Sequence, residues 1–248
     1  MRRTLLFTIA LALVSPAVFA KGRTVTFDSL AGNGSGYLAE PAGAGKHPGI
    51  IVIQEWWGLN DWVKDQADHF ANDGYVALAP DLYRGKVATT PEVAHELMRG
   101  LPQDRAIADL KAAFDYLASR EDVDASRIGV IGWCMGGGFS LDLTLAEPRI
   151  AATVINYGHL ATDPASIAKI HAPLLGNFGG KDQGITPADV HAFEDALKKD
   201  SRQFDIKIYD DAGHAFMNPN NKGGYVEADA KDAQGRIDRF LRESLKRS

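Results

Sequence analysis

The sequence is poor in cysteine, since Cys134 is the only one among 248 residues. An intramolecular disulfide is therefore excluded. The thiol is left as a buried and inert side chain, as a partner for another molecule, or as a chemically reactive group. The sequence also lacks a His-Glu-x-x-His stretch and any pair of cysteines, so it offers no metal site of a known pattern.

The sequence also has fewer basic residues than acidic ones. The 27 lysine and arginine residues are outnumbered by 32 aspartate and glutamate residues, which leaves a net charge of −5. This balance argues against nucleic acid or an anionic membrane surface as the main partner. Nucleotide-binding loops are missing too. Gly45-Lys46 is followed by His47 instead of Ser or Thr, and the glycines of residues 32–36 lack the third glycine of a dinucleotide motif.

Long hydrophobic runs are absent, and a short one lies near the N-terminus. Arg2 and Arg3 precede an apolar run at residues 5–14, and the small residues Val18 and Ala20 follow it. This run is shorter than the roughly 20 residues that a bilayer-spanning helix needs. The pattern therefore favours a secretory signal peptide over a membrane anchor. The two arginines also resemble the start of a twin-arginine signal, without deciding the export route.

We therefore expect residues 1–20 to be removed and residues 21–248 to form a single domain that no longer contacts a membrane. The expected location is the periplasm or the exterior of the cell. With 45% hydrophobic and 24% charged residues, the chain has the profile of an ordinary globular protein. Its length suits one large domain with a buried core.

Short apolar runs alternate with helical patterns along residues 21–248. Strands are expected at residues 24–27, 36–39, 49–53, 75–79, 128–131, 151–155, 174–178 and 204–209. The first two flank an expected glycine-rich turn at residues 32–36. Helices are expected at about residues 104–119, after the helix cap Thr186, and near the C-terminus. This alternation predicts an α/β fold, with a mostly parallel sheet covered by helices on both faces.

The single cysteine lies in Gly132-Trp133-Cys134-Met135-Gly136-Gly137, between an apolar strand and a segment that can form a helix. This context is typical of a nucleophile elbow, in which the central residue is strained and the positions two before and two after it favour glycine. The turn projects the thiol above the sheet edge, and the helix N-terminus favours the thiolate. The alternative is a buried cysteine that packs as a small hydrophobic residue, and the flanking glycines make it the weaker interpretation.

A thiol nucleophile needs a base and an acid. In the α/β-hydrolase fold the acid follows the strand after the elbow unit, and the histidine comes last in the chain. His214, just after the last expected strand, fits this order, whereas His191 lies within an expected helix. Asp182 follows the strand at residues 174–178 and is the preferred acid, with Asp210 and Asp211 as competitors. The non-catalytic alternatives are that His214 is a solvated loop residue and that Asp182 is an ordinary turn aspartate.

A second group of residues, Gln54-Glu55-Trp56-Trp57-Gly58, ends the strand at residues 49–53. In this fold the loop at that place supplies one oxyanion-hole N–H, and the residue after the nucleophile supplies the other. The backbone N–H groups of Trp56 and Met135 are therefore the expected pair. Glu55 could be an ordinary surface acid, but a carboxylate between an apolar strand and paired tryptophans is costly to bury without a purpose.

Several of these stretches together resemble the dienelactone hydrolases, over about residues 37–241. They are Gln54-Glu55-Trp56-Trp57-Gly58, Ala79-Pro80-Asp81-Leu82-Tyr83, the elbow around Cys134, Asp182 and Gly213-His214-Ala215-Phe216. A cysteine in the elbow is fairly specific, because most relatives on this fold carry serine. The resemblance implies that Glu55 interacts with the resting thiol and helps to deprotonate it when substrate arrives.

The sequence departs from the family pattern at two positions. The best-known members hold the substrate carboxylate with two arginines, whereas this chain has Arg84 one place earlier than expected and Asn218 in place of the second arginine. The expected carboxylate clamp is thus incomplete. Glu55, Trp57, Arg84 and Asn218 remain candidates for substrate binding or thiol activation, and the two tryptophans favour neutral, hydrophobic substrates.

The sequence therefore predicts a hydrolase that cleaves a small-molecule ester or lactone through a Cys-His-Asp triad and a covalent acyl-enzyme, with no cofactor and no metal. Two alternatives belong to other classes. The first is a binding protein that kept the fold without turnover, and the second is a thiol redox protein that uses Cys134. The sequence leaves the natural substrate and the oligomeric state open.

We expect export to remove residues 1–20, because Val18 and Ala20 are small enough to be accepted by a signal peptidase. N-terminal sequencing of the exported protein checks this. A mature protein that still begins at Met1 would show the expectation to be wrong.

Overall fold

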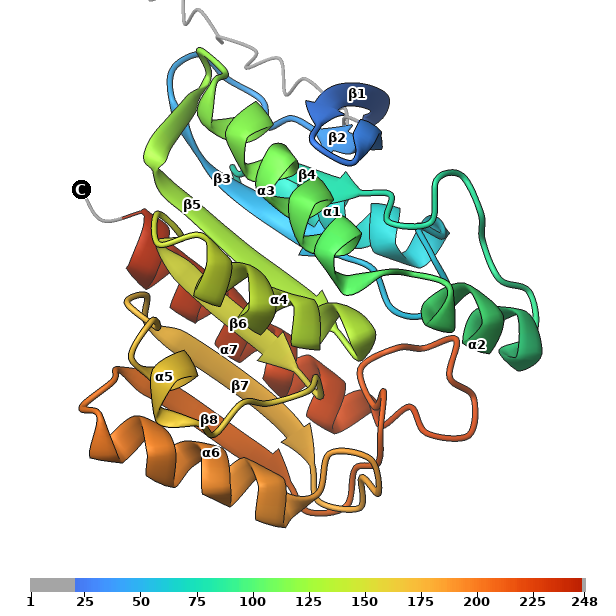
Figure 1. Ribbon diagram of the computed structural model, residues 1–248, viewed down its shortest axis with the longest axis vertical. Helices are drawn as coiled ribbons and strands as arrows, with labels where there is room; N and C mark the ends of the chain where they lie inside the picture. The colour runs from blue at the N-terminus through green and yellow to red at the C-terminus, as the bar shows by residue number, and fades with distance from the viewer. Residues whose placement is uncertain (1–20, 247–248) are drawn as a thin grey trace, which may run out of the picture.

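The computed structural model describes residues 21–246, and the expected signal peptide at residues 1–20 lies outside them. Its centre is one eight-stranded sheet (Figure 1). In spatial order the strands are β1 (Arg23–Ser29), β2 (Gly32–Ala39), β4 (Val76–Pro80), β3 (His47–Ile53), β5 (Val123–Trp133), β6 (Ala152–Asn156), β7 (Leu174–Gly179) and β8 (Phe204–Tyr209). β2 pairs antiparallel with β1 and β4, and every other pairing is parallel. The mostly parallel sheet is thus confirmed.

Helices cover both faces of this sheet (Figure 1). They are α1 (Asp61–Asn72), α2 (Pro91–Arg99), α3 (Gln103–Ala118), α4 (Met135–Ala146), α5 (Pro164–Ile167), α6 (Pro187–Lys199) and α7 (Glu227–Leu245). α1 and α7 pack on one face, and α3, α4, α5 and α6 pack on the other. Among the described residues, no helix is both long and apolar enough to cross a bilayer.

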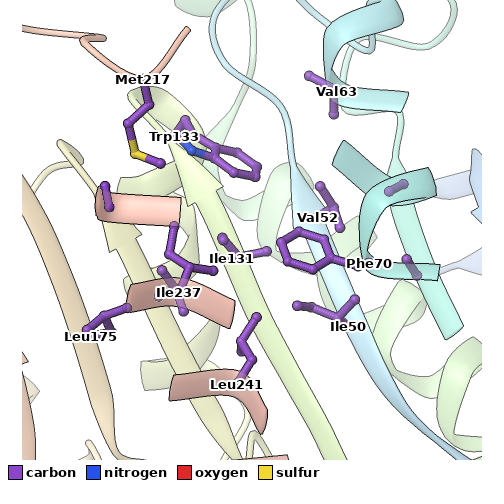
Figure 2. Packing of buried hydrophobic residues seen from close by; sticks show 14 of the residues in the cluster. Ile50, Val52, Val63, Phe70, Ile131, Trp133, Leu175, Met217, Ile237 and Leu241 are labelled. Atoms are coloured by element: carbon purple, nitrogen blue, oxygen red, sulfur yellow. The ribbon is translucent and has the colours of Figure 1, made fainter. Parts of the chain in front are cut away.

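The central strands are apolar on both faces because both faces are buried. In β3, Ile50 and Val52 belong to the core under α1 and α7, whereas Ile51 and Ile53 belong to the core under α3. Figure 2 shows the first of these cores, where Ile237 and Leu241 of α7 approach Ile131 of β5 and Phe70 of α1 approaches β3. Continuous apolar runs, instead of alternating ones, are what a strand covered on both sides requires.

The glycine-rich segment was expected to be a turn, and that expectation is wrong. Residues 32–36 lie within β2, and the chain turns at Leu30 and Ala31. A side chain on Gly34 would overlap the ring of Phe27, and a Cβ on Gly36 would lie 2.7 Å from the Ala79 carbonyl oxygen. These glycines therefore serve close packing inside the sheet, which a sequence pattern does not distinguish from turn formation.

The helix expectations were met where the patterns were strong. Thr186 caps α6 in a capping box with Asp189, and α3 and α7 lie where the apolar spacing predicts them. The helix after Cys134 begins at Met135, so it includes the glycines that follow the cysteine. α1, α2 and α5 were not anticipated.

Candidate active site

Cys134 stands at the sharp turn between β5 and α4, with φ 56° and ψ −120°. A side chain on Gly132 would overlap the backbone of Gly136, and one on Gly136 would overlap the backbone of Ile53 and Gln54. Glycine is therefore required at both positions, as the elbow predicts. The same contacts press the start of α4 against the end of β3, so the Glu55-Trp56 segment begins beside the elbow.

His214 and Asp182 are joined directly, with 2.7 Å between Nδ1 of the imidazole and Oδ2 of the carboxylate. The other carboxylate oxygen accepts hydrogen bonds from the backbone N–H groups of Gly184 and Ile185, at 2.8 and 3.1 Å. Burial acts to raise the pKa of Asp182, but the hydrogen bonds from His214 and the backbone outweigh it and lower the pKa. An ionised carboxylate can only accept, so Nδ1 of His214 carries a proton and Nε2 is left to act as a base.

The competing acids Asp210 and Asp211 and the competing histidine lie elsewhere, and both acids are exposed. Asp211 is exposed and forms an ion pair with Lys181 at 2.7 Å. His191 is exposed on α6 and contacts Glu194 at 3.0 Å. The structure therefore brings together the acid and histidine that chain order favours.

His214 also interacts with Cys134. Burial acts to lower the pKa of His214, but hydrogen bonds to Asp182 and Cys134 and the charges of both groups raise it to about 10. An imidazole in this setting has a strong tendency to hold a second proton. A thiol beside such a base can transfer its proton to it and become the nucleophilic thiolate.

The expected oxyanion-hole residues lie at the ends of the same elements. Met135 is the first residue of α4, and the first N–H groups of a helix have no carbonyl partner within it. Trp56 follows β3, whose end touches the elbow at Gly136. Trp57 packs against Trp56 with ring centres 5.0 Å apart, and both side chains are half-buried.

Glu55 and Asn218 form a buried pair. Nδ2 of Asn218 donates to Oε2 of Glu55 at 2.6 Å, and the two residues are only 2% and 3% exposed. Oε1 of Glu55 is buried without a hydrogen-bond partner among the described residues. Burial raises the pKa of Glu55 to about 7, although the Asn218 hydrogen bond and the charge of His214 lower it. Asn218 thus contacts Glu55 and is not free to bind a substrate carboxylate.

Arg84 does not reach this site. Its guanidinium donates to both carboxylate oxygens of Asp109 at 2.8 Å and to the backbone oxygen of Ala31. Asp109 lies on α3 with a side chain only 3% exposed, so this carboxylate needs a cationic partner. Arg84 is therefore committed to Asp109, and its contact with a substrate stays a prediction.

Three residues near the site were not anticipated. Tyr157 follows β6 with φ 39°, and its ring centre lies 5.3 Å from that of His214. The hydroxyl of Tyr83 donates to the sulfur of Met135 at 3.3 Å. His95 of α2 meets Trp56 edge to face, with 4.8 Å between ring centres. Tyr157 and Tyr83 both follow the carboxyl end of a strand, where sites gather in such sheets, and that rule could have found them.

Residues 35–245 match the model of the dienelactone hydrolase family. A candidate carboxymethylenebutenolidase of Salmonella typhimurium is 35% identical over 216 residues, which cover 81% of this chain and 79% of that protein. Protein usf of Aquifex pyrophilus is 32% identical over 231 residues, covering 90% and 99%.

A similar structure has also been solved. The crystal structure of a candidate dienelactone hydrolase of Klebsiella pneumoniae superposes with a TM-score of 0.81 at 29% identity. The superposition covers 90% of this chain and 98% of that one.

We expect Glu55→Gln to stabilise the protein at pH 8 and to change its stability little at pH 5. The pKa of Glu55 rises from 4.5 to about 7 on folding, so the folded state loses stability as the pH rises between these values. Glutamine has no charge to bury, and the gain at pH 8 should be at most about 3 kcal/mol. Urea unfolding at both pH values measures it. An equal gain at pH 5 would contradict the burial argument.

Proposed function

The chain belongs to the dienelactone hydrolase family and is a hydrolase of esters or lactones, and from this premise we propose that it works through an acyl-enzyme on Cys134. The observation that carries the proposal is the strained elbow at Cys134 beside a histidine that is held by a buried aspartate. This arrangement matches the roles of nucleophile, base and orienting acid. Asp182 would hold the imidazole in the tautomer that leaves Nε2 free.

The proposed reaction has two halves. The Cys134 thiolate attacks the carbonyl carbon, and the N–H groups of Met135 and Trp56 stabilise the negative oxygen that forms. As the carbon–oxygen bond breaks, the proton on Nε2 of His214 passes to the leaving alkoxide. His214 then takes a proton from water, whose oxygen attacks the thioester, and the acid is released with the thiol restored.

The setting of this reaction is also a proposal. The basic and apolar residues 1–20 support export, so the enzyme would act in the periplasm or outside the cell on a small ester or lactone. The net charge of −5 supports the view that neither nucleic acid nor an anionic membrane is its partner.

We expect Cys134→Ala to abolish turnover of aryl esters while the thermal unfolding midpoint changes little, because alanine fits the elbow. Cys134→Ser should keep only a small part of the activity, since a hydroxyl is a far weaker acid than a thiol. Iodoacetamide should label one site, because the chain has one cysteine. Activity should fall in step with labelling, and full activity after complete labelling would contradict the role of Cys134.

The charges around the site bear on substrate class. Neither of the two positions expected to bind a carboxylate supplies a free cation, because Arg84 is paired with Asp109 and position 218 is an asparagine bound to Glu55. Trp56, Trp57 and His95 form an aromatic cluster beside the elbow. Aromatic surface without a cation favours a neutral and hydrophobic acyl or lactone group.

We therefore expect neutral esters and lactones to be cleaved with a higher kcat/KM than matched substrates that carry a carboxylate. Pairs that differ only in a free acid or its methyl ester measure the preference. The argument fails if the acid form is preferred tenfold, or by about 1.4 kcal/mol of transition-state binding. Asn218→Arg alone should not create a preference for acids, because the new guanidinium would meet the Glu55 carboxylate first.

A further inference from the structure

A histidine and two aspartates meet between α1 and α7, outside the proposed triad. His69 belongs to α1, Asp73 ends that helix, and Asp238 belongs to α7. Nε2 of His69 lies 3.2 Å from Oδ1 of Asp238 and 3.8 Å from Oδ2 of Asp73, and the three ligand atoms all lie within 4.8 Å of one another. Two ligands that bind one Zn²⁺ in a tetrahedron, each at about 2.0 Å, are about 3.3 Å apart. The cluster therefore has the spacing of a metal site.

The fold holds these groups in place. His69 and Asp73 are one helical turn apart, and the backbone N–H of Asp73 donates to the backbone oxygen of His69 at 3.1 Å. The neighbouring residues Phe70 of α1 and Ile237 of α7 are buried in the same core (Figure 2). Packing of the two helices thus brings the ligands together from distant parts of the chain, and for this reason the sequence shows no metal-binding pattern.

The polar contacts in this cluster cannot all be hydrogen bonds at once. Nε2 of Gln234 lies 2.8 Å from Oδ1 of Asp238 and 3.2 Å from Nε2 of His69. The ring nitrogen of His69 either donates to Asp238 or accepts from Gln234, so one of the three contacts is unmatched in either tautomer. A cation removes this conflict, because an unprotonated ring nitrogen and a carboxylate oxygen are both ligands. The amide of Gln234 can then turn its oxygen toward the ion.

The charges of the cluster also favour a cation. Within residues 21–246, the carboxylates of Asp73 and Asp238 form ion pairs with His69 and with no lysine or arginine. Lys246 reaches the same corner, but its ammonium lies over the ring of Tyr75 and donates to the backbone oxygen of Asp73. Two negative charges that share one histidine attract a divalent ion. The nitrogen ligand favours Zn²⁺ over Mg²⁺ and Ca²⁺, which prefer oxygen.

We propose that His69, Asp73 and Asp238 form a binding site for one Zn²⁺ that links α1 to α7, with the fourth position open to Gln234 or water. α1 joins the parallel strands β3 and β4, so it runs back from the sheet edge that carries Cys134, and its last turn lies toward the opposite edge. The ion therefore has a structural role and no part in the proposed reaction. It stabilises the folded chain, because the unfolded chain does not hold the three ligands together.

The test measures zinc binding by the mature chain without an affinity tag. The parent protein carries Cys134→Ala, so that the thiol of the proposed triad offers no ligand to the metal. After treatment with EDTA and its removal, zinc chloride is titrated at pH 7.5 and followed by calorimetry. We expect one ion to bind per chain with a dissociation constant in the micromolar range. The thermal unfolding midpoint should rise by about 5 °C when free zinc is about 100 times that constant.

Variants of the ligands locate the ion. His69→Ala and Asp73→Asn should each weaken zinc binding by about tenfold or more, because each removes a direct ligand. His191→Ala is the matched control, since His191 is an exposed histidine that contacts a single carboxylate, that of Glu194. It should bind zinc as the parent does. In ¹H–¹⁵N spectra of the imidazole rings, zinc should shift the Nε2 signal that is missing from His69→Ala.

Two results would overturn the inference. The first is a parent protein that shows no saturable zinc binding in the calorimeter. The second is a bound ion whose affinity is the same in Asp73→Asn as in the parent, or is lost only in His214→Ala, because the ion then lies at another place. Asp73 is exposed, so its replacement by asparagine should fold and decides the question even if His69→Ala does not fold.

Discussion

The backbone packs so closely around the elbow that neither Gly132 nor Gly136 has room for a Cβ, and the rest of the site depends on this packing. It holds Cys134 at φ 56°, a value that a residue with a side chain adopts only when its surroundings enforce it. The enforcement comes from backbone on both sides, since Gly136 also abuts the carbonyl groups of Ile53 and Gln54. The loop that begins at Glu55 is thereby placed next to the thiol by main-chain packing alone.

The order of the sheet completes the site. β3, β5, β6 and β7 are neighbours, so their carboxyl ends deliver Glu55, Cys134, Tyr157 and Asp182 to one edge, at strand spacings of about 4.8 Å. The loop after β8 adds His214. Several ionisable groups therefore meet within one small region, and Glu55 and Asp182 among them are buried. Their pKa values move apart, to about 7 for Glu55 and about 10 for His214, as expected where charge is retained for a purpose and not for stability.

Much of this could be predicted from the sequence, because the strongest signals are local. Each expected strand corresponds to a strand of the sheet, and chain order alone singles out Asp182 and His214. Three features could not be predicted. The glycines of β2 allow close packing against residues that are distant in sequence. Arg84 is paired with an aspartate on α3. Asn218 is hydrogen-bonded to Glu55, which lies 163 positions away in the sequence. In each case the contacting residue is brought close only by the tertiary fold, so neither periodicity nor a local motif identifies it.

The asparagine at position 218 bears on the charge balance of the site through its hydrogen bond to Glu55. An arginine there would neutralise Glu55, and the attraction between Glu55 and the His214 imidazolium would weaken accordingly. Asparagine does neither, yet its amide satisfies one oxygen of a carboxylate that is almost wholly buried. A single uncharged side chain thus satisfies Glu55 without adding a cation, so this position gives the site no reason to prefer an acidic substrate.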